Sequence, residues 1–292
     1  PAAAAMKYRE PLFRPPGEAD SLIFQVAYGC PHNGCRFCGM YKEVVYRRRD
    51  RGELLAEIAA AGRRYPETGR IFLADGDVMA LSGGDLIDGL EALNAAFPRL
   101  ARISLYANGS SIAAKSDAEL RRLRSLKLGT LYLGLESGSQ PVLDGWGKTE
   151  SVEAMIAAVI RAQGLGFRAS VMILLGLGGR TRREEHIAAT AAALNRMQPR
   201  LLSALRYIAL PGLPPPQGYC PVSEYEAVDE LRRIVSGLEL ERTVFRANHS
   251  SNPLPLAGRF PADRERLLAE LEAELASGLL DRRGPGRTPL FL

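Results

Sequence analysis

Three cysteines stand within nine residues near the start of the chain, in the segment Cys30-Pro-His-Asn-Gly-Cys35-Arg-Phe-Cys38. The spacing is C-x4-C-x2-C, and the fourth cysteine of the sequence, Cys220, lies far along the chain. Three thiolates on one loop can hold three corners of an iron–sulfur cluster and leave one iron without a protein ligand. An iron that is open in this way can bind and activate a small molecule. This segment is therefore the strongest indication of chemistry in the sequence.

A zinc site, a ferredoxin cluster and disulfides are the alternative uses of these cysteines. A structural zinc site needs four Cys or His ligands, and His32 could be the fourth, although its place between the first two cysteines is cramped. A plant-type [2Fe–2S] ferredoxin uses the same run with a distant fourth cysteine, which Cys220 could supply. Disulfides fit poorly because 292 residues hold four cysteines, three of them crowded together. Spacing alone favours an iron–sulfur cluster, with zinc as the main competitor.

Composition sets broad limits on the class of protein. Hydrophobic residues make up 46% and charged residues 24% of the chain, which is ordinary for a globular protein with a sizeable core. The net charge of +5 would help an anionic ligand to approach, but nucleic-acid binding is not indicated. The sequence contains no run of 18 apolar residues, so no membrane span is predicted. The residues before Met6 lack the features of a signal peptide, so a reducing, cytoplasmic setting is expected.

Strand-like apolar runs alternate with amphipathic helical runs along the chain. Strands are predicted at 21–28, 70–74, 102–107, 130–135, 167–175 and 201–209, and helices at 50–64, 84–97, 116–126, 151–163, 182–197, 222–238 and 261–276. Ser116 is a predicted N-cap, and Pro261 is predicted in the first turn of the last helix. Six successive strand–helix units favour a parallel α/β fold, either an open barrel or a doubly wound sheet. Such a chain is not a ferredoxin, which is a small and mainly β domain.

Polar or glycine-rich segments follow the predicted strands where each strand ends. They are Asp75-Gly76-Asp77, Asn108-Gly109-Ser110-Ser111, Glu136-Ser137-Gly138-Ser139 and Gly176-Leu177-Gly178-Gly179. Any one of them is explained by a tight turn and a helix cap. In parallel α/β folds, however, active sites gather at the carboxyl ends of the strands. Together with the cysteine loop on the same rim, these segments predict an active site.

These motifs resemble the radical S-adenosylmethionine (radical SAM) superfamily, over roughly 21–209. The resemblance is carried by the three cysteines, the DGD at 75–77, LGLESGS at 133–139 and MILLGLGG at 172–179. Within the superfamily they look most like the branch of the Elongator catalytic subunit and the methylthiotransferases. The common cluster spacing there is C-x3-C-x2-C, so this motif is expanded by one residue. The usual GGE is replaced by Asp75-Gly76-Asp77, which keeps a small central residue and an acid.

The resemblance implies the fold and the division of the chain. It implies an α/β fold, a partial (β/α)6 TIM-like barrel with a C-terminal helical extension. The expected parts are an N-terminal extension at 1–20, the radical SAM core at 21–240, and a C-terminal extension at 241–292 that caps or flanks the barrel. No second cysteine cluster exists, so an auxiliary iron–sulfur site is not expected.

The resemblance also implies two cofactors, a [4Fe–4S] cluster and SAM. Cys30, Cys35 and Cys38 would be the cluster ligands. Phe37 would lie near the adenine of SAM, and Asp75, Gly76 and Asp77 would lie near its ammonium group. Glu136 would accept from the ribose, and the Ser139 hydroxyl would add a polar contact. The backbone at Gly176 and near Tyr207 would approach the adenosine closely. Lys148 and Arg206 are candidates for the methionine carboxylate, although exposed salt bridges are the expected role of each. His186 is predicted to be a solvated helix residue.

Two functional hypotheses remain. The first is a radical SAM enzyme that cleaves SAM reductively to methionine and a 5′-deoxyadenosyl radical, which abstracts a hydrogen atom from an unidentified substrate. An electron donor of the flavodoxin or ferredoxin type would serve it, and Asn248, His249 and Asn252, beyond the matched core, would contact the substrate. The second is a non-catalytic iron–sulfur or zinc protein, either an electron carrier or a metal-stabilised α/β binding module. No role is assigned to Cys220.

Overall fold

The computed structural model describes residues 6–282, which fall into two compact units. The first unit comprises the residues up to Asn33, Cys38–Leu133 and Arg161–Arg168, and the second comprises Gly34–Phe37, Gly134–Ile160 and the residues from Ala169 onward. Residues 1–5 and 283–292 lie outside the described part, and with them the segment before Met6 and the outer ends of both predicted extensions. The predicted boundaries at residues 20 and 240 stay predictions.

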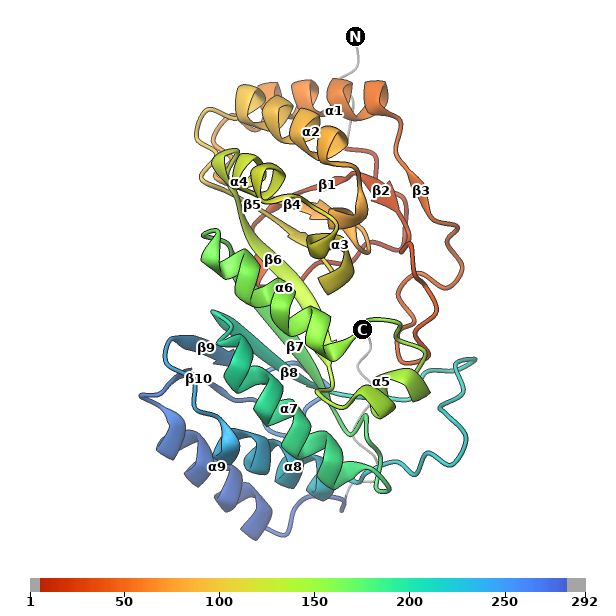
Figure 1. Ribbon diagram of the computed structural model, residues 1–292, viewed down its shortest axis with the longest axis vertical. Coiled ribbons are helices and arrows are strands. Elements are labelled where there is room, and N and C mark those ends of the chain that lie inside the picture. Colours follow the sequence, from red (N-terminus) through yellow and green to blue (C-terminus); the bar gives the residue numbers. More distant parts are fainter. Residues whose placement is uncertain (1–5, 283–292) are drawn as a thin grey trace. The chain divides into compact units, whose positions relative to one another are not determined.

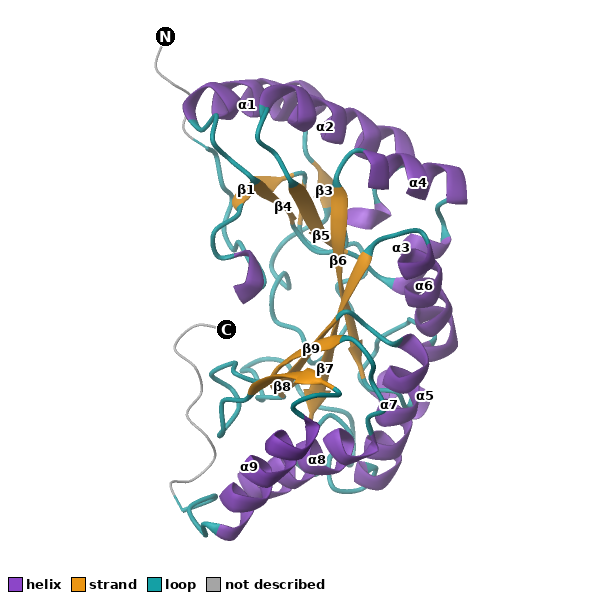
Figure 2. Ribbon diagram, turned by 90° about the vertical axis from the view of Figure 1, so that its left-hand side faces the viewer, coloured by secondary structure: helices purple, strands orange, loops and turns teal. Residues whose placement is uncertain are grey.

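The first unit is built on parallel strands in the order β1-β4-β5-β6. The strands are β1 (Leu22–Gln25), β4 (Arg70–Ala74), β5 (Arg102–Tyr106) and the first part of β6 (Leu128–Glu136), and the helices are α1 (Arg51–Arg64), α2 (Gly83–Ala96), α3 (Gly109–Ala113) and α4 (Asp117–Ser125), with short 3-10 helices η1 (Pro16–Glu18) and η2 (Val78–Ala80). Helices α1, α2 and α4 cover one face of these strands (Figures 1 and 2). Fully buried aromatic and aliphatic side chains, Phe24, Phe72 and Ile103 among them, form the core.

The predicted first strand, 21–28, is divided in two. After β1, the strand β2 (Ala27–Tyr28) leaves the parallel sheet and pairs antiparallel with β3 (Arg47–Arg48), with Ala27 opposite Arg48 and Tyr28 opposite Arg47. The turn from one sheet to the other occurs at Val26, whose N–H donates to Ala74 and whose carbonyl accepts from Arg49. The β2–β3 pair therefore holds the two ends of the cysteine loop together.

The second unit carries the parallel strands β7-β8-β9 followed by an antiparallel β10. Its elements are β8 (Leu201–Arg206), β9 (Thr243–Arg246), β10 (Ala257–Phe260), α5 (Gln140–Gly145), α7 (Arg183–Met197), α8 (Glu224–Gly237) and α9 (Arg264–Ala276), with most of α6 (Val152–Gly164) and β7 (Arg168–Leu175). Helices α7, α8 and α9 pack side by side (Figure 2). The α/β class predicted from the sequence is confirmed, whereas β9 and β10 were not predicted.

Helix starts follow their capping residues. The side chain of Ser116 accepts the N–H of Glu119 at 3.2 Å, and the Glu119 carboxylate accepts the N–H of Ser116 at 2.8 Å, so the predicted cap of α4 is confirmed as a capping box. The prediction for Pro261 is wrong. Helix α9 begins at Arg264, because Pro261 stands in a turn whose carbonyl accepts the N–H of Arg264.

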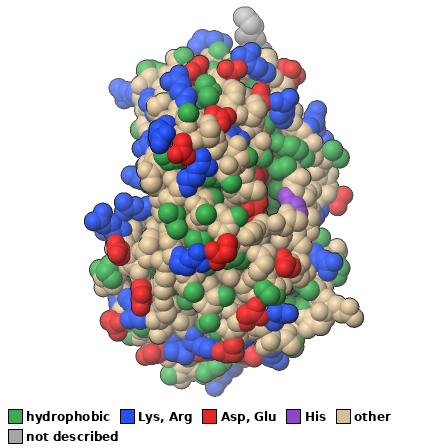
Figure 3. Space-filling view, viewed as in Figure 1, with side chains coloured by type: hydrophobic (Ala, Val, Ile, Leu, Met, Phe, Trp, Pro, Cys, Tyr) green, Lys and Arg blue, Asp and Glu red, His purple; other side chains and the backbone are tan. Residues whose placement is uncertain are grey.

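Charged side chains of both signs are interspersed on the face shown in Figure 3. Many of them form exposed ion pairs, such as Arg196 with Glu153 at 2.6 Å and Arg180 with Glu226 at 2.8 Å. Pairs of this kind contribute little to stability individually. Within the described residues, no helix has the length and apolar character needed to cross a membrane.

Candidate functional site

The cysteine loop leaves β2 and returns at β3, with Cys30 and Cys38 in the first unit and Cys35 in the second. Cys30, Cys35 and Cys38 are half-buried thiols, and none of them forms a disulfide. Gly76, in the loop after β4, lies directly against the start of this loop, and its N–H donates to Gly29 at 3.2 Å. A Cβ on Gly76 would come within 2.7 Å of both Cα and Cβ of Cys30. The backbone can approach the first cysteine this closely because residue 76 is glycine.

The sequence implies an iron–sulfur cluster on the thiols of the cysteine loop. Within residues 6–282, no three His, Cys, Asp or Glu side chains are grouped as the ligands of a metal ion. The donor chemistry nevertheless fits, because three soft thiols stand on one loop whose ends are joined by β2 and β3. The glycine cradle against Cys30 fits as well. The same three residues are therefore the set that would hold the cluster.

Asp75 anchors the base of the cysteine loop. Its buried carboxylate accepts hydrogen bonds from Gln25 at 3.2 and 3.3 Å, from the N–H of Gly29 at 3.2 Å and from the hydroxyl of Tyr41 at 3.2 Å. Burial raises the pKa of Asp75 to about 6, against the opposing effect of these hydrogen bonds. The Asp75 side chain, which was predicted to face SAM, is thus hydrogen-bonded to Gly29, directly before Cys30, and to Tyr41, after Cys38.

Asp77 joins the loops after β4 and β5. Its buried carboxylate accepts from the hydroxyl of Ser111 at 2.8 Å and from the side-chain amide of Asn108 at 3.2 Å. Asn108 and Ser111 belong to the polar segment that follows the predicted third strand. Within the first unit, the structure therefore brings together two of the strand-end segments, as the parallel arrangement predicted.

Glu136 ends β6 in the second unit, with a left-handed backbone at φ 62°. Its carboxylate is buried, and Oε1 lies 3.7 Å from Lys148 Nζ, which also donates to the carbonyl of Gly134 at 2.7 Å. Burial raises the pKa of Glu136, and the ammonium of Lys148 opposes that shift. Its Oε2 has no hydrogen-bond partner among the described residues. A buried acceptor without a partner is suited to a ligand hydroxyl.

Lys148 is buried, so its predicted role in an exposed salt bridge is wrong, and the same holds for Arg206. Arg206 Nη1 lies 3.6 Å from Glu224 Oε1, and its side chain is 7% exposed. His186 is fully buried as well, so its prediction as a solvated helix residue is also wrong. Two adjacent glutamates suggested an exposed helix start, whereas the side of α7 that carries His186 faces inward.

Ser139 and Gly176 are both held by the protein itself. Ser139 is the N-cap of α5, where its hydroxyl accepts the N–H of Val142 at 3.3 Å and donates to Glu185 at 2.5 Å. Gly176, at φ 81°, donates its N–H to Glu230 at 2.6 Å and accepts the hydroxyl of Tyr219 at 2.9 Å. The predicted SAM contact by the Ser139 hydroxyl would have to compete with these bonds.

An aromatic cluster surrounds Trp146 in the second unit. The ring centre of Trp146 lies 4.7 Å from that of Tyr207, 5.1 Å from that of Tyr219 and 6.3 Å from that of Phe37. The indole N–H donates to the carbonyl of Leu177 at 2.7 Å. The buried hydroxyl of Tyr207 has no hydrogen-bond partner in the described part of the chain, and burial raises its pKa.

The structure therefore brings two predicted residues, Phe37 and Tyr207, to one cluster. The carbonyl of Trp146 also accepts the N–H of Arg36 at 2.8 Å, so the segment between the second and third cysteines is held by the same residue. Sequence reasoning missed Trp146 and Tyr219. The signal available was that Trp146 is the one tryptophan in the chain, placed shortly after the LGLESGS motif.

The predicted substrate residues lie in the connection between β9 and β10. Asn248 is exposed, and the half-buried His249 contacts the hydroxyl of Ser251 through Nδ1 at 2.8 Å. Burial lowers the pKa of His249. Asn252 donates its side-chain amide to the carbonyls of Ala204 and Ala247, each at 2.8 Å. Asn252 thus fixes this connection to β8, and a substrate role for the three residues stays a prediction.

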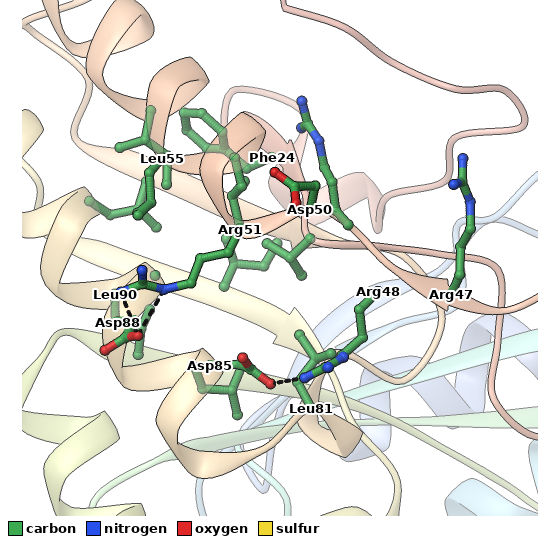
Figure 4. A pocket seen from close by; sticks show the side chains of 18 residues that line it. Phe24, Arg47, Arg48, Asp50, Arg51, Leu55, Leu81, Asp85, Asp88 and Leu90 are labelled. Atoms are coloured by element: carbon green, nitrogen blue, oxygen red, sulfur yellow. Dashed lines mark hydrogen bonds and ion pairs between the residues drawn. The ribbon is translucent and has the colours of Figure 1, made fainter.

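A cavity of about 690 Å³ lies in the first unit, and none of the predicted site residues lines it. It lies beneath α1 and α2, with leucines on its walls, and Figure 4 shows its charged rim. There Arg48 pairs with Asp85 at 2.5 Å and Arg51 with Asp88 at 2.8 Å. Arg48 and Arg51 are therefore already paired with acids of the protein itself.

The family model described as the Radical SAM superfamily matches residues 24–191. This match includes the three cysteines, Asp75, Glu136 and Gly176, and ends before Tyr207. No curated protein matches the sequence.

Several solved structures are similar to this chain in fold. Coproporphyrinogen III oxidase (HemN) from Escherichia coli, described as a radical SAM enzyme, has a TM-score of 0.59 and 19% identity over 74% of this chain and 51% of its own. Methylornithine synthase (PylB) has a TM-score of 0.54 and 14% identity, over 87% and 81%. The radical SAM methyltransferase TsrM from Kitasatospora setae, solved with cobalamin and a [4Fe–4S] cluster, has a TM-score of 0.52 and 16% identity, over 64% and 36%.

These likenesses confirm the partial TIM-like barrel class of fold. The chain spans about half the length of the coproporphyrinogen III oxidase and about a third of the methyltransferase.

Proposed function

The chain belongs to the radical SAM superfamily, and on that premise we propose that Cys30, Cys35 and Cys38 hold its [4Fe–4S] cluster. Members of the superfamily use such a cluster together with SAM. The bound cofactors supply the reductive cleavage of SAM to methionine and a 5′-deoxyadenosyl radical, which abstracts a hydrogen atom from a substrate. Membership favours an enzyme over the non-catalytic iron–sulfur or zinc protein.

One observation carries the assignment of the ligands. Three half-buried thiols, none in a disulfide, stand on one loop whose ends are joined by β2 and β3. The carboxylate of Asp75 holds that loop at Gly29 and Tyr41, and Gly76 packs against Cys30. These contacts fix the backbone around the first cysteine before any cofactor binds. Pre-organisation of this kind lowers the cost of ordering the ligands.

We assign the adenosyl part of SAM to residues of the second unit. Glu136 offers a buried carboxylate oxygen without a partner, which is suited to accepting a ribose hydroxyl. Gly176 supplies a glycine turn at positive φ, and Phe37 and Tyr207 supply aromatic surface beside Trp146. The hydroxyl of Ser139 completes the proposed set in this unit, and SAM contacts of the backbones of Asp75, Gly76 and Asp77 stay a prediction from the sequence. The protein would bind, orient and shield the cofactor.

The branch and the partners are also proposals. The motifs LGLESGS and MILLGLGG support the proposal that the chain resembles the branch of the Elongator catalytic subunit and the methylthiotransferases. A reductant of the flavodoxin or ferredoxin type would supply the electron, in a reducing cytoplasm that suits free thiolates. Asn248, His249 and Asn252 are proposed on the substrate side. Since the chain spans about half of the oxidase it resembles, that protein's substrate is not carried over.

The reaction class is tested by its products. The reduced, reconstituted protein incubated anaerobically with SAM alone should slowly release 5′-deoxyadenosine and methionine, because uncoupled cleavage needs no substrate. Chromatography of the quenched mixture measures both products. Protein without reductant is the matched control and should release neither. S-adenosylhomocysteine as the sole product would replace this proposal with polar methyl transfer.

A further inference from the structure

A buried series of polar contacts joins the loops that follow β6 and β7 in the second unit. Ser137 Oγ lies 2.7 Å from His186 Nδ1 and accepts the N–H of Ser139 at 3.0 Å. On the other side of the imidazole, Nε2 lies 3.2 Å from Glu230 Oε1. That same carboxylate oxygen accepts the N–H of Gly176 at 2.6 Å. Ser137, His186 and Glu230 are all fully buried.

The Ser137 hydroxyl accepts the N–H of Ser139 and shares a second hydrogen bond with His186 Nδ1, because a hydroxyl has one donor and two acceptor sites. The other ring nitrogen, Nε2, faces the Glu230 carboxylate without the alignment of a hydrogen bond. The imidazole therefore links Ser137 to Glu230.

The series ends at residues that flank the proposed adenosyl contacts. Ser137 directly follows Glu136, and Gly176 opens the turn after β7. The peptide of Gly176 is held on both sides, because its carbonyl accepts the Tyr219 hydroxyl at 2.9 Å. A Cβ at Gly176 would also come within 2.7 Å of Val222 Cγ2. The turn is therefore built against residues 219–230, which lie beyond the segment matched by the family.

Packing of α7 on α8 does not by itself require this arrangement. A buried carboxylate is costly to desolvate, and apolar side chains of similar size would join two helices at lower cost. Here Glu230 Oε2 has no hydrogen-bond partner among the described residues, and Arg183 Nε stays 4.0 Å away. The hydrogen bond that the Glu230 carboxylate does accept comes from the N–H of Gly176. The buried acid thus acts on the turn after β7.

We infer that His186 and Glu230 are positioning residues, which fix the Gly176 turn and the Glu136 loop for the adenosyl group of SAM. Neither side chain would touch the ligand. Each would act through backbone groups, Glu230 through the amide of Gly176 and His186 through Ser137. The inference rests on the proposed function of these loops.

The effect of these residues on adenosyl binding can be measured by isothermal titration calorimetry with two nucleosides. SAM is titrated into the reconstituted protein, and 5′-methylthioadenosine, which lacks the amino-acid group, is titrated into protein with and without the cluster. Glu230→Ala and Ser137→Ala each leave a buried backbone N–H without its acceptor, so both Kd values should rise about tenfold or more. Iron content should not change, because the cysteine loop keeps its contacts.

A conservative variant separates positioning from general stability. Glu230→Gln keeps a carbonyl oxygen for the Gly176 amide, so it should restore both Kd values to within about threefold of the natural protein. Asn195→Ala is the matched control on α7, the helix of His186, since Asn195 joins α7 to the carbonyl of Gly237 and the N–H of Glu239. It should lower the melting temperature and leave both Kd values unchanged.

The outcomes distinguish this inference from the proposed function. If the natural protein binds neither nucleoside, the proposed function fails. If it binds both, and Glu230→Ala and Ser137→Ala bind within about twofold of it, the positioning role is wrong while the function stands. If Glu230→Ala fails to fold, the Kd values of Glu230→Gln and Ser137→Ala decide whether the positioning role holds. A Glu230→Gln variant that folds normally but has lost nucleoside affinity would overturn the role assigned to the acceptor.

Discussion

Glu136 carries a buried carboxylate with one oxygen near Lys148 and the other without a partner among the described residues. Removing it should weaken SAM binding about tenfold or more, because a ribose hydroxyl would lose its acceptor in a desolvated site. The measurement is calorimetric titration of reconstituted Glu136→Ala with SAM, after the iron content is shown to be intact.

A matched acid in the same unit controls for charge. Glu153 is exposed and pairs with Arg196, so Glu153→Ala removes the same charge and should leave the Kd of SAM unchanged. Equal SAM affinity in Glu136→Ala and the natural protein would remove Glu136 from the ribose site.

Asp75 gives the protein a pH dependence that belongs to the cysteine loop. Its pKa rises from 3.8 to about 6 on folding, so the folded protein binds this proton more tightly than the unfolded chain. The contribution of the carboxyl to stability is therefore largest below about pH 4 and is lost as pH rises to about 6. Asp75→Asn should lose this dependence.

Urea denaturation of the apoprotein at several pH values between 4 and 7 measures the effect. Taking the difference between the natural protein and Asp75→Asn cancels the other carboxyls. A difference in unfolding free energy that stays constant over this pH range would show that Asp75 is not titrating as described.

At the scale of single residues, the sequence predicted positions better than contacts. The three cysteines, Asp77 and Glu136 were found because residue type and place after a strand are visible in the sequence. The buried states of His186 and Lys148 were not, because they depend on neighbours distant in the chain, such as Glu230. Hydrogen bonds of Asp75 to Gln25 and Tyr41 are likewise set by packing.

Two glycines test how the helices α1 and α2 are packed. Gly62 in α1 lies against α2, where an added Cβ would come within 2.6 Å of the Ala96 carbonyl oxygen and 2.9 Å of its Cβ. Gly89 in α2 has nothing within 4 Å of such an atom. Gly62→Ala should therefore destabilise the protein by about 1–3 kcal/mol, through forced separation of the helices.

Gly89→Ala is the matched counterpart and should stabilise the protein by about 0.5–1 kcal/mol, because alanine restricts the unfolded chain and favours helix. Thermal and urea denaturation measure both changes. Equal effects of the two substitutions would mean that α1 and α2 do not approach each other at Gly62.

At the scale of elements, strong periodicity predicted every long helix and the strands β4 to β8 to within a few residues. Short elements were missed. The strands β3, β9 and β10 have two to four residues each, and helices α3 and α5 have five and six. Segments of this length carry too little pattern to be recognised, since tertiary pairing decides their conformation. The division of the first strand at Val26 has the same cause.

At the scale of the molecule, the family match ends at residue 191, yet residues beyond it support the proposed site. Tyr219 and Glu230 hold Gly176, and Tyr207 and Tyr219 pack on Trp146. The fold class could be predicted because six strand–helix units leave few arrangements. The contact of α8 with the Gly176 turn could not be predicted, because it joins residues more than 40 positions apart in the chain.

The central claim is that Cys30, Cys35 and Cys38 hold one [4Fe–4S] cluster. The most direct measurement is anaerobic reconstitution followed by iron analysis and Mössbauer spectroscopy of the natural protein, each Cys→Ala variant, the triple variant and Cys220→Ala. The account predicts about four irons per chain in the natural protein and in Cys220→Ala, and loss of the cluster in each of the other variants. A fully assembled cluster in the triple variant would contradict it.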